Sequence, residues 1–458
     1  LGVQLQGNSS DMLIERNKIG SDVVTDKVQN IGIGILSSRS FTVNRNTIAG
    51  LSRPSTSSVA GMVIGIATGG ADVKQGMIMN NIIRDVKHTG VGTSAYAGYG
   101  IRLSGNTNTS DLLVYNNAIS DIKGDGDAGI SFNPVGIYIN QGGGYYIYNN
   151  SVNLFGALGY AGASAAASSA LMVQAAAVVN LDIRNNILSN SQTFPGALGK
   201  SYAIYSVTGA SAFADVNYNL YNSTGEDAGF GFLTATAYPD LAAWKVITGK
   251  DASSLSGSPA FTDSVNLMPV LSNPDVWNLN GNGFPTQYVS TDILGTPRST
   301  TVATGPTDIG AYEVTPTVNP APATADGAPA PGGTQTFTYA GRQVGSITWG
   351  NSGTVPASVN VQYYSGTTPP GLTEALILGT SYWKVEATGG TGYTYAITFN
   401  YDENALGMLS ESDMNLAKRD AGVWNGFISG SVNTTANTVT ATGLNSFSEF
   451  ALFQVNIA

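Results

Sequence analysis

The sequence predicts an all-β protein in which a parallel β-helix is followed by an antiparallel β-sandwich domain. The first observation is a phrase of alternating apolar residues that ends on asparagine and recurs throughout the first half of the chain. The second is a proline-rich stretch near residue 320, and the third is a series of short alternating runs beyond it. Repeats of short strands are typical of a solenoid, and closely spaced short strands are typical of a sandwich.

The asparagine phrase sets the repeat, with steps of 29, 35, 36, 33, 36 and 33 residues. Its positions are Asn17, Asn46, Asn81, Asn117, Asn150, Asn186 and Asn219. A second alternating run, for example at residues 32–35 and 136–139, precedes each asparagine, so each repeat holds at least two strands. In stacked coils the asparagines would form a column. We expect their amides to bond to the asparagine above and below, because an inward amide is costly when unpaired.

This periodicity over residues 1–225 resembles the right-handed parallel β-helix family, the pectate-lyase-like fold. Residues 226–313 are predicted to form final irregular coils and a C-terminal cap, including a short helix over residues 238–249 with Pro239 in its first turn. The segment from Asp292 to Arg298, followed by residues 308–313, resembles the closing segment of secreted bacterial β-helix proteins. Those relatives carry Asp-x-Asp-Gly-x-x-Arg. Leu294 replaces the second Asp, which weakens an ion-binding role and leaves a capping role.

Residues 314–332 are predicted to be a semi-rigid Pro-rich linker, and residues 333–458 a β-sandwich domain. The closing stretch 439–452 resembles the sandwich that precedes the sorting signal in cargo of the Bacteroidetes-type (type IX) secretion system. This resemblance implies export. The chain begins at Leu1 already in a strand-like pattern, so we expect a mature or trimmed form whose first coil is open.

Composition narrows the classes of partner. Only 11% of residues are charged, the net charge is -10 and no Lys/Arg-rich run occurs, which argues against nucleic acid and anionic membrane surfaces. The absence of cysteine excludes disulfides, thiol catalysis and Cys-based metal sites. No apolar run is long enough for a membrane-spanning helix, and no cofactor is expected.

Few residues suggest chemistry. Asp121, Asp125 and Asp127 alternate with glycine, which suits calcium, but a polar turn between coils is the favoured interpretation and no metal site is predicted. His88 has no second histidine or triad order around it, so we expect a solvated or structural role.

Catalysis of polysaccharide cleavage on this fold needs convergent carboxylates, or calcium with a Lys or Arg base. The candidates stand singly in the sequence; they are Asp72, Lys74, Arg84, Asp85 and Lys87. Tyrosines that could stack on sugars, or pack inward, gather in the middle repeats; they are Tyr96, Tyr99, Tyr138, Tyr145, Tyr146 and Tyr148.

Three hypotheses follow. The favoured one is a secreted, extracellular or cell-surface structural or adhesive protein that self-associates, as a filament or surface-layer subunit, through an uncovered first coil. The alternatives are a carbohydrate-active enzyme, either a polysaccharide lyase or a glycoside hydrolase, and a non-catalytic glycan-binding protein.

Overall fold

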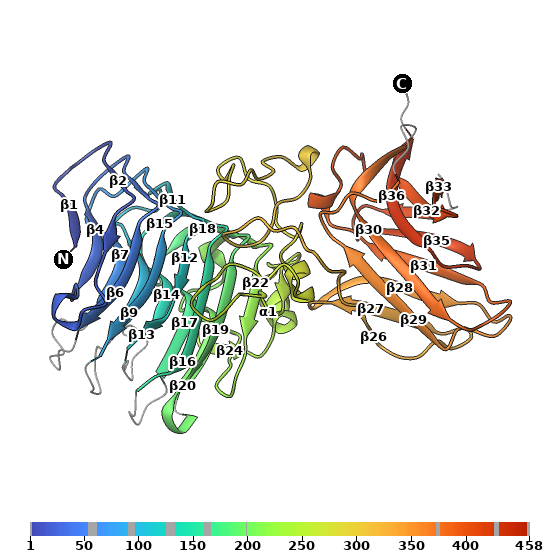
Figure 1. Cartoon of the computed structure of the whole chain (residues 1–458), viewed down its shortest axis with the longest axis horizontal. Coiled ribbons are helices and arrows are strands. Elements are labelled where there is room, and N and C mark those ends of the chain that lie inside the picture. Colours follow the sequence, from blue (N-terminus) through green and yellow to red (C-terminus); the bar gives the residue numbers. More distant parts are fainter. Residues whose placement is uncertain are drawn as a thin grey trace. The chain divides into compact units, whose positions relative to one another are not determined.

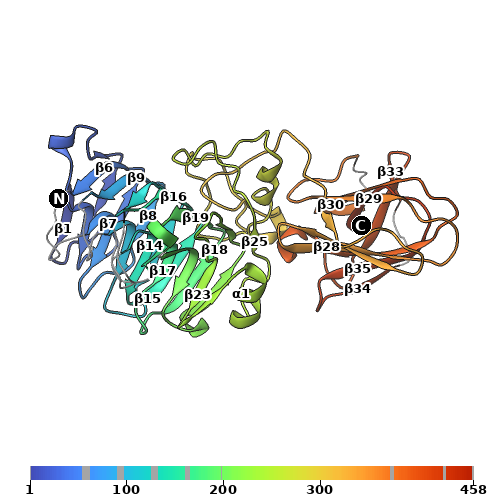
Figure 2. The same cartoon turned by 90° about the horizontal axis from the view of Figure 1, so that it is seen from below.

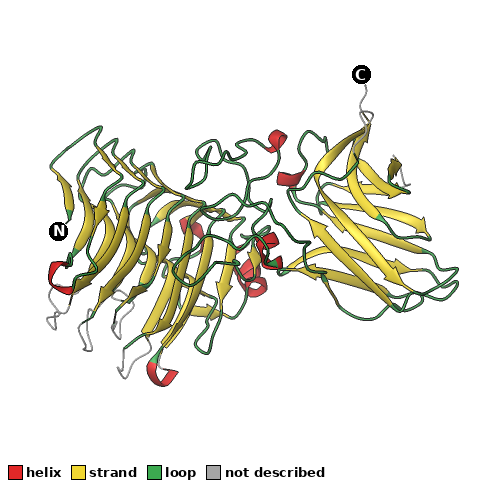
Figure 3. Cartoon of the chain, viewed as in Figure 1, coloured by secondary structure: helices red, strands yellow, loops and turns green. Residues whose placement is uncertain are grey.

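The computed structural model describes residues 2–53, 62–89, 97–124, 133–159, 166–197, 199–371, 376–425 and 430–455, in which strands are the predominant secondary structure (Figure 3). They form two compact units. Unit 1 comprises Leu1–Val270, Thr291–Pro297 and Ile309–Glu313. Unit 2 comprises Leu271–Ser290, Arg298–Asp308 and Val314–Ala458.

Unit 1 is a parallel β-solenoid built from three sheets (Figures 1 and 2). The first sheet contains β1 (Val3–Gln6), β4 (Ile31–Leu36), β7 (Val63–Gly69), β10 (Gly98–Ser104), β14 (Val135–Gln141), β17 (Ala166–Val173), β20 (Gly199–Ser206), β23 (Gly231–Leu233) and β24 (Thr236–Tyr238). The second contains β2 (Leu13–Glu15), β5 (Thr42–Asn44), β8 (Met77–Met79), β11 (Leu112–Tyr115), β15 (Gly143–Tyr148), β18 (Val179–Arg184) and β21 (Phe213–Asn217).

The third sheet contains β3 (Lys18–Ile19), β6 (Thr47–Arg53), β9 (Ile82–His88), β12 (Ala118–Ser120), β16 (Ser151–Ala157), β19 (Ile187–Thr193), β22 (Leu220–Ser223) and β25 (Leu255–Ser256), with β13 (Ile122–Lys123) also paired to β9. From β1 to β22, each coil therefore supplies one strand to each sheet. Neighbours within a sheet are parallel, except the β23–β24 pair that ends the first sheet. The predicted parallel β-helix is confirmed.

The interior of the solenoid is filled by columns of branched apolar side chains. The register places Ile33, Ile66, Ile101 and Ile137 beside one another on successive strands of the first sheet. All four are fully buried. Stacking equivalent residues gives each coil the same cross-section as its neighbours, so one repeated pattern builds a continuous core.

A column of glycines next to these isoleucines lets the first and third sheets approach closely. A Cβ atom at Gly65 would lie 2.6 Å from the Ile83 side chain, and one at Gly100 would lie 2.5 Å from that of Ile119. Both distances are too short for real carbon contacts. The glycine of the recurring Gly-Ile phrase is therefore explained by the space that the opposite isoleucine fills.

One α-helix, α1 (Leu241–Thr248), lies in the final part of unit 1. Asp240 caps it by accepting the Ala243 amide at 2.8 Å, and Gly249 ends it in the left-handed conformation. The helix was predicted to begin earlier, with Pro239 in its first turn, but Pro239 precedes the cap. Buried Leu241 and Trp244 join the core of the coils.

Unit 2 contains two antiparallel sheets, as predicted. One holds β26 (Thr324–Ala325), β27 (Thr334–Tyr339), β28 (Arg342–Trp349), β31 (Tyr395–Asn400), β35 (Thr438–Leu444) and β34 (Gly430–Asn433). The other holds β29 (Ser358–Tyr364), β30 (Leu376–Thr388), β36 (Glu449–Val455), β32 (Asn415–Asp420) and β33 (Val423–Asn425). One apolar core spans both sheets, and the Trp383 and Phe399 rings stack across it with centroids 4.6 Å apart.

Short 3-10 helices connect several of these elements; they are η1 (Val24–Asp26), η4 (Pro195–Ala197), η5 (Ala210–Ala212), η6 (Pro274–Asn278), η7 (Val302–Thr304) and η8 (Glu403–Ala405). Within the described parts of the chain, no helix is long and apolar enough to cross a membrane.

Candidate functional site

The asparagine column occupies the corner between the second and third sheets. The residue before each column asparagine has a left-handed backbone, with φ of 57° at Asn80 and 53° at Asn116. Asparagine tolerates this conformation better than most residues. The recurring Asn-Asn phrase therefore has two separate causes, because its first residue makes the bend and its second points into the coil.

The column asparagines are joined by hydrogen bonds from coil to coil. The backbone N–H and the side-chain Nδ2 of Asn81 donate to Oδ1 of Asn117, at 3.1 and 2.9 Å. Asn117 donates in the same way to Asn150, at 3.0 and 2.9 Å. In the six column asparagines after Asn17, Nδ2 also donates to a carbonyl of an adjacent coil, as Asn117 does to Ile78 at 2.9 Å. Both donors and the acceptor of each inner amide are thereby satisfied without water.

The same pair of hydrogen bonds, from the backbone N–H and from Nδ2, joins every step from Asn17 to Asn219. Asn17 is exposed, whereas the six column asparagines that follow it are almost completely buried.

The column ends on a buried carboxylate that the sequence did not single out. The backbone N–H of Asn219 donates to Oγ of Ser254 at 2.9 Å, and the Ser254 hydroxyl in turn donates to Asp251. The other donors to Asp251 are the Tyr221 hydroxyl, at 3.0 Å, and Nε1 of Trp244, at 2.9 Å. The asparagine column is thus closed by Ser254, Asp251 and Trp244 from the segment after the coils, together with Tyr221 of β22.

Asp251 is 1% exposed. Burial raises its pKa to about 6, although the bonds from Ser254, Trp244 and Tyr221 favour the charged form and oppose the rise. The two carboxylate oxygens accept hydrogen bonds from Tyr221, Trp244 and Ser254. The carboxylate is therefore placed to close the core rather than to meet a substrate.

A second, partial row of asparagines runs beside the first, and the sequence analysis did not separate it. Nδ2 of Asn80 donates to Oδ1 of Asn44 at 2.9 Å, and Nδ2 of Asn116 donates to Oδ1 of Asn80 at 3.2 Å. Asn116 also donates to the carbonyl of Thr291 at 2.7 Å. The available signal in the sequence was that Asn80 and Asn116 each directly precede a column asparagine, and that Asn44 precedes one by two residues. This row ties the returning segment 291–297 to the coils.

Two of the predicted catalytic candidates lie in a row of alternating charges on the third sheet. Lys87 Nζ lies 2.7 Å from Asp85 and 2.5 Å from Asp121. Lys27 lies 3.5 Å from Asp85, and Lys123 lies 3.6 Å from Asp121. We call these five residues the charge row. The coil stacking brings them together, although they stand singly in the sequence.

The environment of the charge row keeps Lys87 and Asp85 ionised. Burial on its own would lower the pKa of Lys87, but the bonds and charges of Asp121 and Asp85 outweigh it and raise that pKa. Burial would raise the pKa of Asp85, and Lys87 and Lys27 outweigh it in the opposite direction. A general base must give up its proton near neutral pH, so these shifts disfavour Lys87 in that role.

The remaining charged candidates lie elsewhere. Arg39 forms a two-pronged ion pair with Asp72, and Lys74 lies 4.0 Å from the same carboxylate. The hydrogen bond from Arg39 is the main cause of the lowered pKa of Asp72. Arg84 is exposed and lines a hollow of about 330 Å³ together with Asp263 and Tyr312. The predicted candidates therefore divide among three places.

The second sheet carries a charged cluster that the sequence analysis missed. Arg184 binds Asp182 through two nitrogens, at 2.7 and 2.5 Å, and lies 3.7 Å from Asp215. Tyr148 donates to Asp182 at 2.7 Å. Burial is the main cause of the raised pKa of Asp215. The two carboxylates share one guanidinium, an arrangement that binds neighbouring coils to each other.

The calcium candidates are only partly described. Asp121 belongs to the charge row, and Asp125 and Asp127 lie outside the described residues. Within the described ranges, no group of three or more acidic or histidine side chains is arranged to hold a metal ion. His88 is 4% exposed at the end of β9.

The tyrosines of the middle coils do not form one platform. Tyr99 and Tyr138 stack with centroids 4.5 Å apart in an apolar cluster separate from the coil interior. Tyr145 is fully buried and donates to the Gln141 carbonyl at 2.6 Å. Tyr146 and Tyr148 lie together on β15 with centroids 6.2 Å apart. Tyr96 lies outside the described residues.

Comparison with known proteins gives no family. No protein-family model matches the chain, and no curated protein is similar to it. Among solved structures, the Dettilon tailspike protein is 13% identical, with a TM-score of 0.17 over 97% of this chain and 86% of that chain. A TM-score this low carries no functional conclusion.

Proposed function

We propose that the protein is an extracellular structural or adhesive protein whose coils act as a stiff, non-catalytic scaffold. The observation that carries this proposal is the pairing of ionisable side chains along the stack. The charge row, the Arg39–Asp72 pair and the Asp182–Arg184 pair all link one coil to another or brace a strand. The export-type resemblance of the closing stretch supports an extracellular location.

A scaffold and an enzyme on this fold need different pKa values and different partners for their ionisable side chains. An enzyme requires a base with a lowered pKa or an acid exposed to substrate. Lys87 has a raised pKa and two carboxylate partners, and Asp85 has a lowered pKa. Their geometry fits lateral cohesion between coils. Each such partly exposed pair is expected to contribute modestly, on the order of 1 kcal/mol or less.

Incubation with acidic and neutral polysaccharides tests the proposal. We expect the 458-residue chain to release no unsaturated or reducing ends, and Lys87→Met to behave identically. The matched control is Lys200→Met, which changes an exposed lysine on β20. Release by the wild type that Lys87→Met abolishes and Lys200→Met preserves would overturn the scaffold proposal.

Self-association is the second part of the proposal. In the part of the chain that the structure describes, β1, β2 and β3 each pair with a neighbour on one side only, and the open edge of such a strand accepts a further strand. For the 458-residue chain we expect a sedimentation coefficient that rises with concentration. Leu5→Lys should abolish the rise, because a second copy stacked on β1 would bury that side chain.

The matched control for self-association is Gln6→Lys, at an exposed position on the same strand. This variant should still associate. A wild-type chain that sediments as a monomer at every concentration would contradict self-association and leave the scaffold itself intact.

A further inference from the structure

The strands of unit 2 part at one place and leave a groove. β30 pairs with β29 as far as Thr388, opposite Ser358. Its pairing with β36 ends at Lys384, opposite Glu449, and the Val385 amide makes one more bond to the Ser448 carbonyl at 2.9 Å. Beyond that point the chain that leads into β36 turns away towards β35. Residues 386–388 therefore border an opening.

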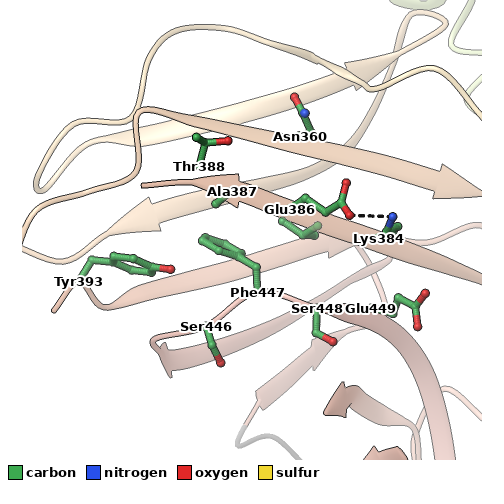
Figure 4. A pocket seen from close by; sticks show the side chains of 11 residues that line it. Asn360, Lys384, Glu386, Ala387, Thr388, Tyr393, Ser446, Phe447, Ser448 and Glu449 are labelled. Carbon is green, nitrogen blue, oxygen red and sulfur yellow. Dashed lines mark ion pairs between the residues drawn. The ribbon is translucent and has the colours of Figure 1, made fainter. Parts of the chain in front are cut away.

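This opening is a hollow of about 700 Å³ (Figure 4). Its lining residues are Asn360, Lys384, Val385, Glu386, Ala387, Thr388, Tyr393, Ser446, Phe447, Ser448 and Glu449. We call this hollow the β30 groove. Its size suits a few sugar rings or a short peptide.

One wall of the β30 groove is aromatic and firmly supported. Tyr393 and Phe447 are half-buried and stacked, with ring centroids 5.8 Å apart. Phe447 also stacks on Tyr395 at 4.4 Å and meets Trp349 at 6.1 Å. The Tyr393 ring extends along the groove with its hydroxyl directed towards Phe447 (Figure 4). A ring face held in this way is available to stack without further ordering.

The charges in the groove are already balanced. Lys384 pairs with Glu386 at 2.7 Å, and Glu449 pairs with Arg419 at 2.6 Å. A charged ligand would have to compete with these pairs. The groove therefore favours a ligand without net charge.

The remaining polar groups suit hydroxyls. Asn360 and Thr388 are exposed, and their side chains make no hydrogen bond to any described residue. Ser446 accepts from Lys418 at 2.7 Å, which leaves its own proton free to turn towards the groove. Amide and hydroxyl groups both donate and accept, as the hydroxyls of a sugar do.

We propose that the β30 groove binds a neutral oligosaccharide, with a sugar ring against Tyr393 and its hydroxyls bonded to Asn360 and Thr388. This inference names the ligand class for the adhesive role proposed above. An extended peptide that added to β30 is the competing occupant. It would find only residues 386–388 unpaired on this side, too short an edge for a strand of ordinary length.

Titration of the full 458-residue chain with neutral hexasaccharides tests the inference. The probes are the glucose (β-1,4 and β-1,3), xylose and mannose hexasaccharides, with a galacturonic acid hexasaccharide and an alternating Val-Thr hexapeptide as competitors. We expect at least one neutral probe to bind. Tyr393→Ala should weaken it by about 10-fold, and Asn360→Ala by about 5-fold.

The control is Tyr288→Ala, which removes a tyrosine 44% exposed outside the β30 groove and should leave binding unchanged. Asn360→Ala alters an exposed side chain and keeps the test valid if Tyr393→Ala disturbs packing. Binding of no neutral probe, binding of only the acidic probe or the peptide, or affinity unaffected by both groove substitutions would overturn the inference. None of these outcomes bears on the scaffold, which is tested by polysaccharide release.

Discussion

Replacement of Asn117 by alanine should lower the free energy of unfolding by about 3 kcal/mol or more. The substitution leaves the buried backbone N–H of Asn81 without its partner, and it removes one partner each from the Asn81 side chain, the Asn150 side chain and the Ile78 carbonyl. Each buried polar group left unpaired costs about 1–3 kcal/mol, and Asn117 itself is fully buried. Urea unfolding followed by circular dichroism measures the loss.

The matched control is Asn17→Ala in the outermost described coil. Asn17 is exposed and only donates, to Asn46 and to the Glu15 carbonyl. Its loss should cost less than about 1 kcal/mol, because water replaces the missing partner. Equal effects at Asn17 and Asn117 would contradict a stabilising role for the column.

Asp251 should make the protein more stable as the pH falls from 7 towards 4. Its folded pKa of about 6 lies above the ordinary value of 3.8, so the folded state binds the proton more tightly. The contribution is fully present below the unfolded pKa and is lost as the pH rises through 6. A shift of this size corresponds to a gain of up to about 3 kcal/mol at the acid end. Unfolding free energies at pH 7 and 4.5 measure it.

Asp251→Asn should flatten this pH dependence, because the amide does not titrate. Asp22→Asn changes an exposed aspartate and should leave the dependence as in the wild type. A variant lacking the Asp251 carboxylate that still gains the same stability on acidification would show that other groups cause the effect.

The coils were predictable because stacking repeats one cross-section. A polar residue that must point inward needs an identical partner in the next coil, so it recurs at the coil length and leaves a visible period. The same period extends to the cap, since Ser254 lies 35 residues after Asn219 and its hydroxyl accepts a hydrogen bond from the backbone N–H of Asn219. A search for asparagine alone missed it because serine takes the place of the amide there.

The charge row shows that charged residues which stand singly in the sequence can be neighbours in the folded coils. Asp121 lies 36 residues after Asp85, and Lys123 lies 36 residues after Lys87, which is the coil length between Asn81 and Asn117. Residues one coil apart are neighbours in the sheet. Aligning the repeats on their column asparagines would therefore have predicted that these charged side chains lie together.

The β30 groove had no comparable signal. It depends on where β36 separates from β30 and turns to the other sheet, which is a long-range antiparallel pairing. Short alternating runs predict that strands exist, but not which strands pair or where a pair ends. Tyr393 and Phe447 come from distant parts of the sequence and meet only in the folded domain.

The central claim is that the coils form one continuous scaffold, joined by the asparagine column and closed at Asp251. Hydrogen exchange of the intact chain tests it most directly, because the backbone amides of Asn81, Asn117, Asn150 and Asn186 all donate to buried side chains. The account predicts that these amides exchange only in global unfolding and with similar protection. Fast exchange at one of them, with its neighbours protected, would show that the column is interrupted and would contradict the account.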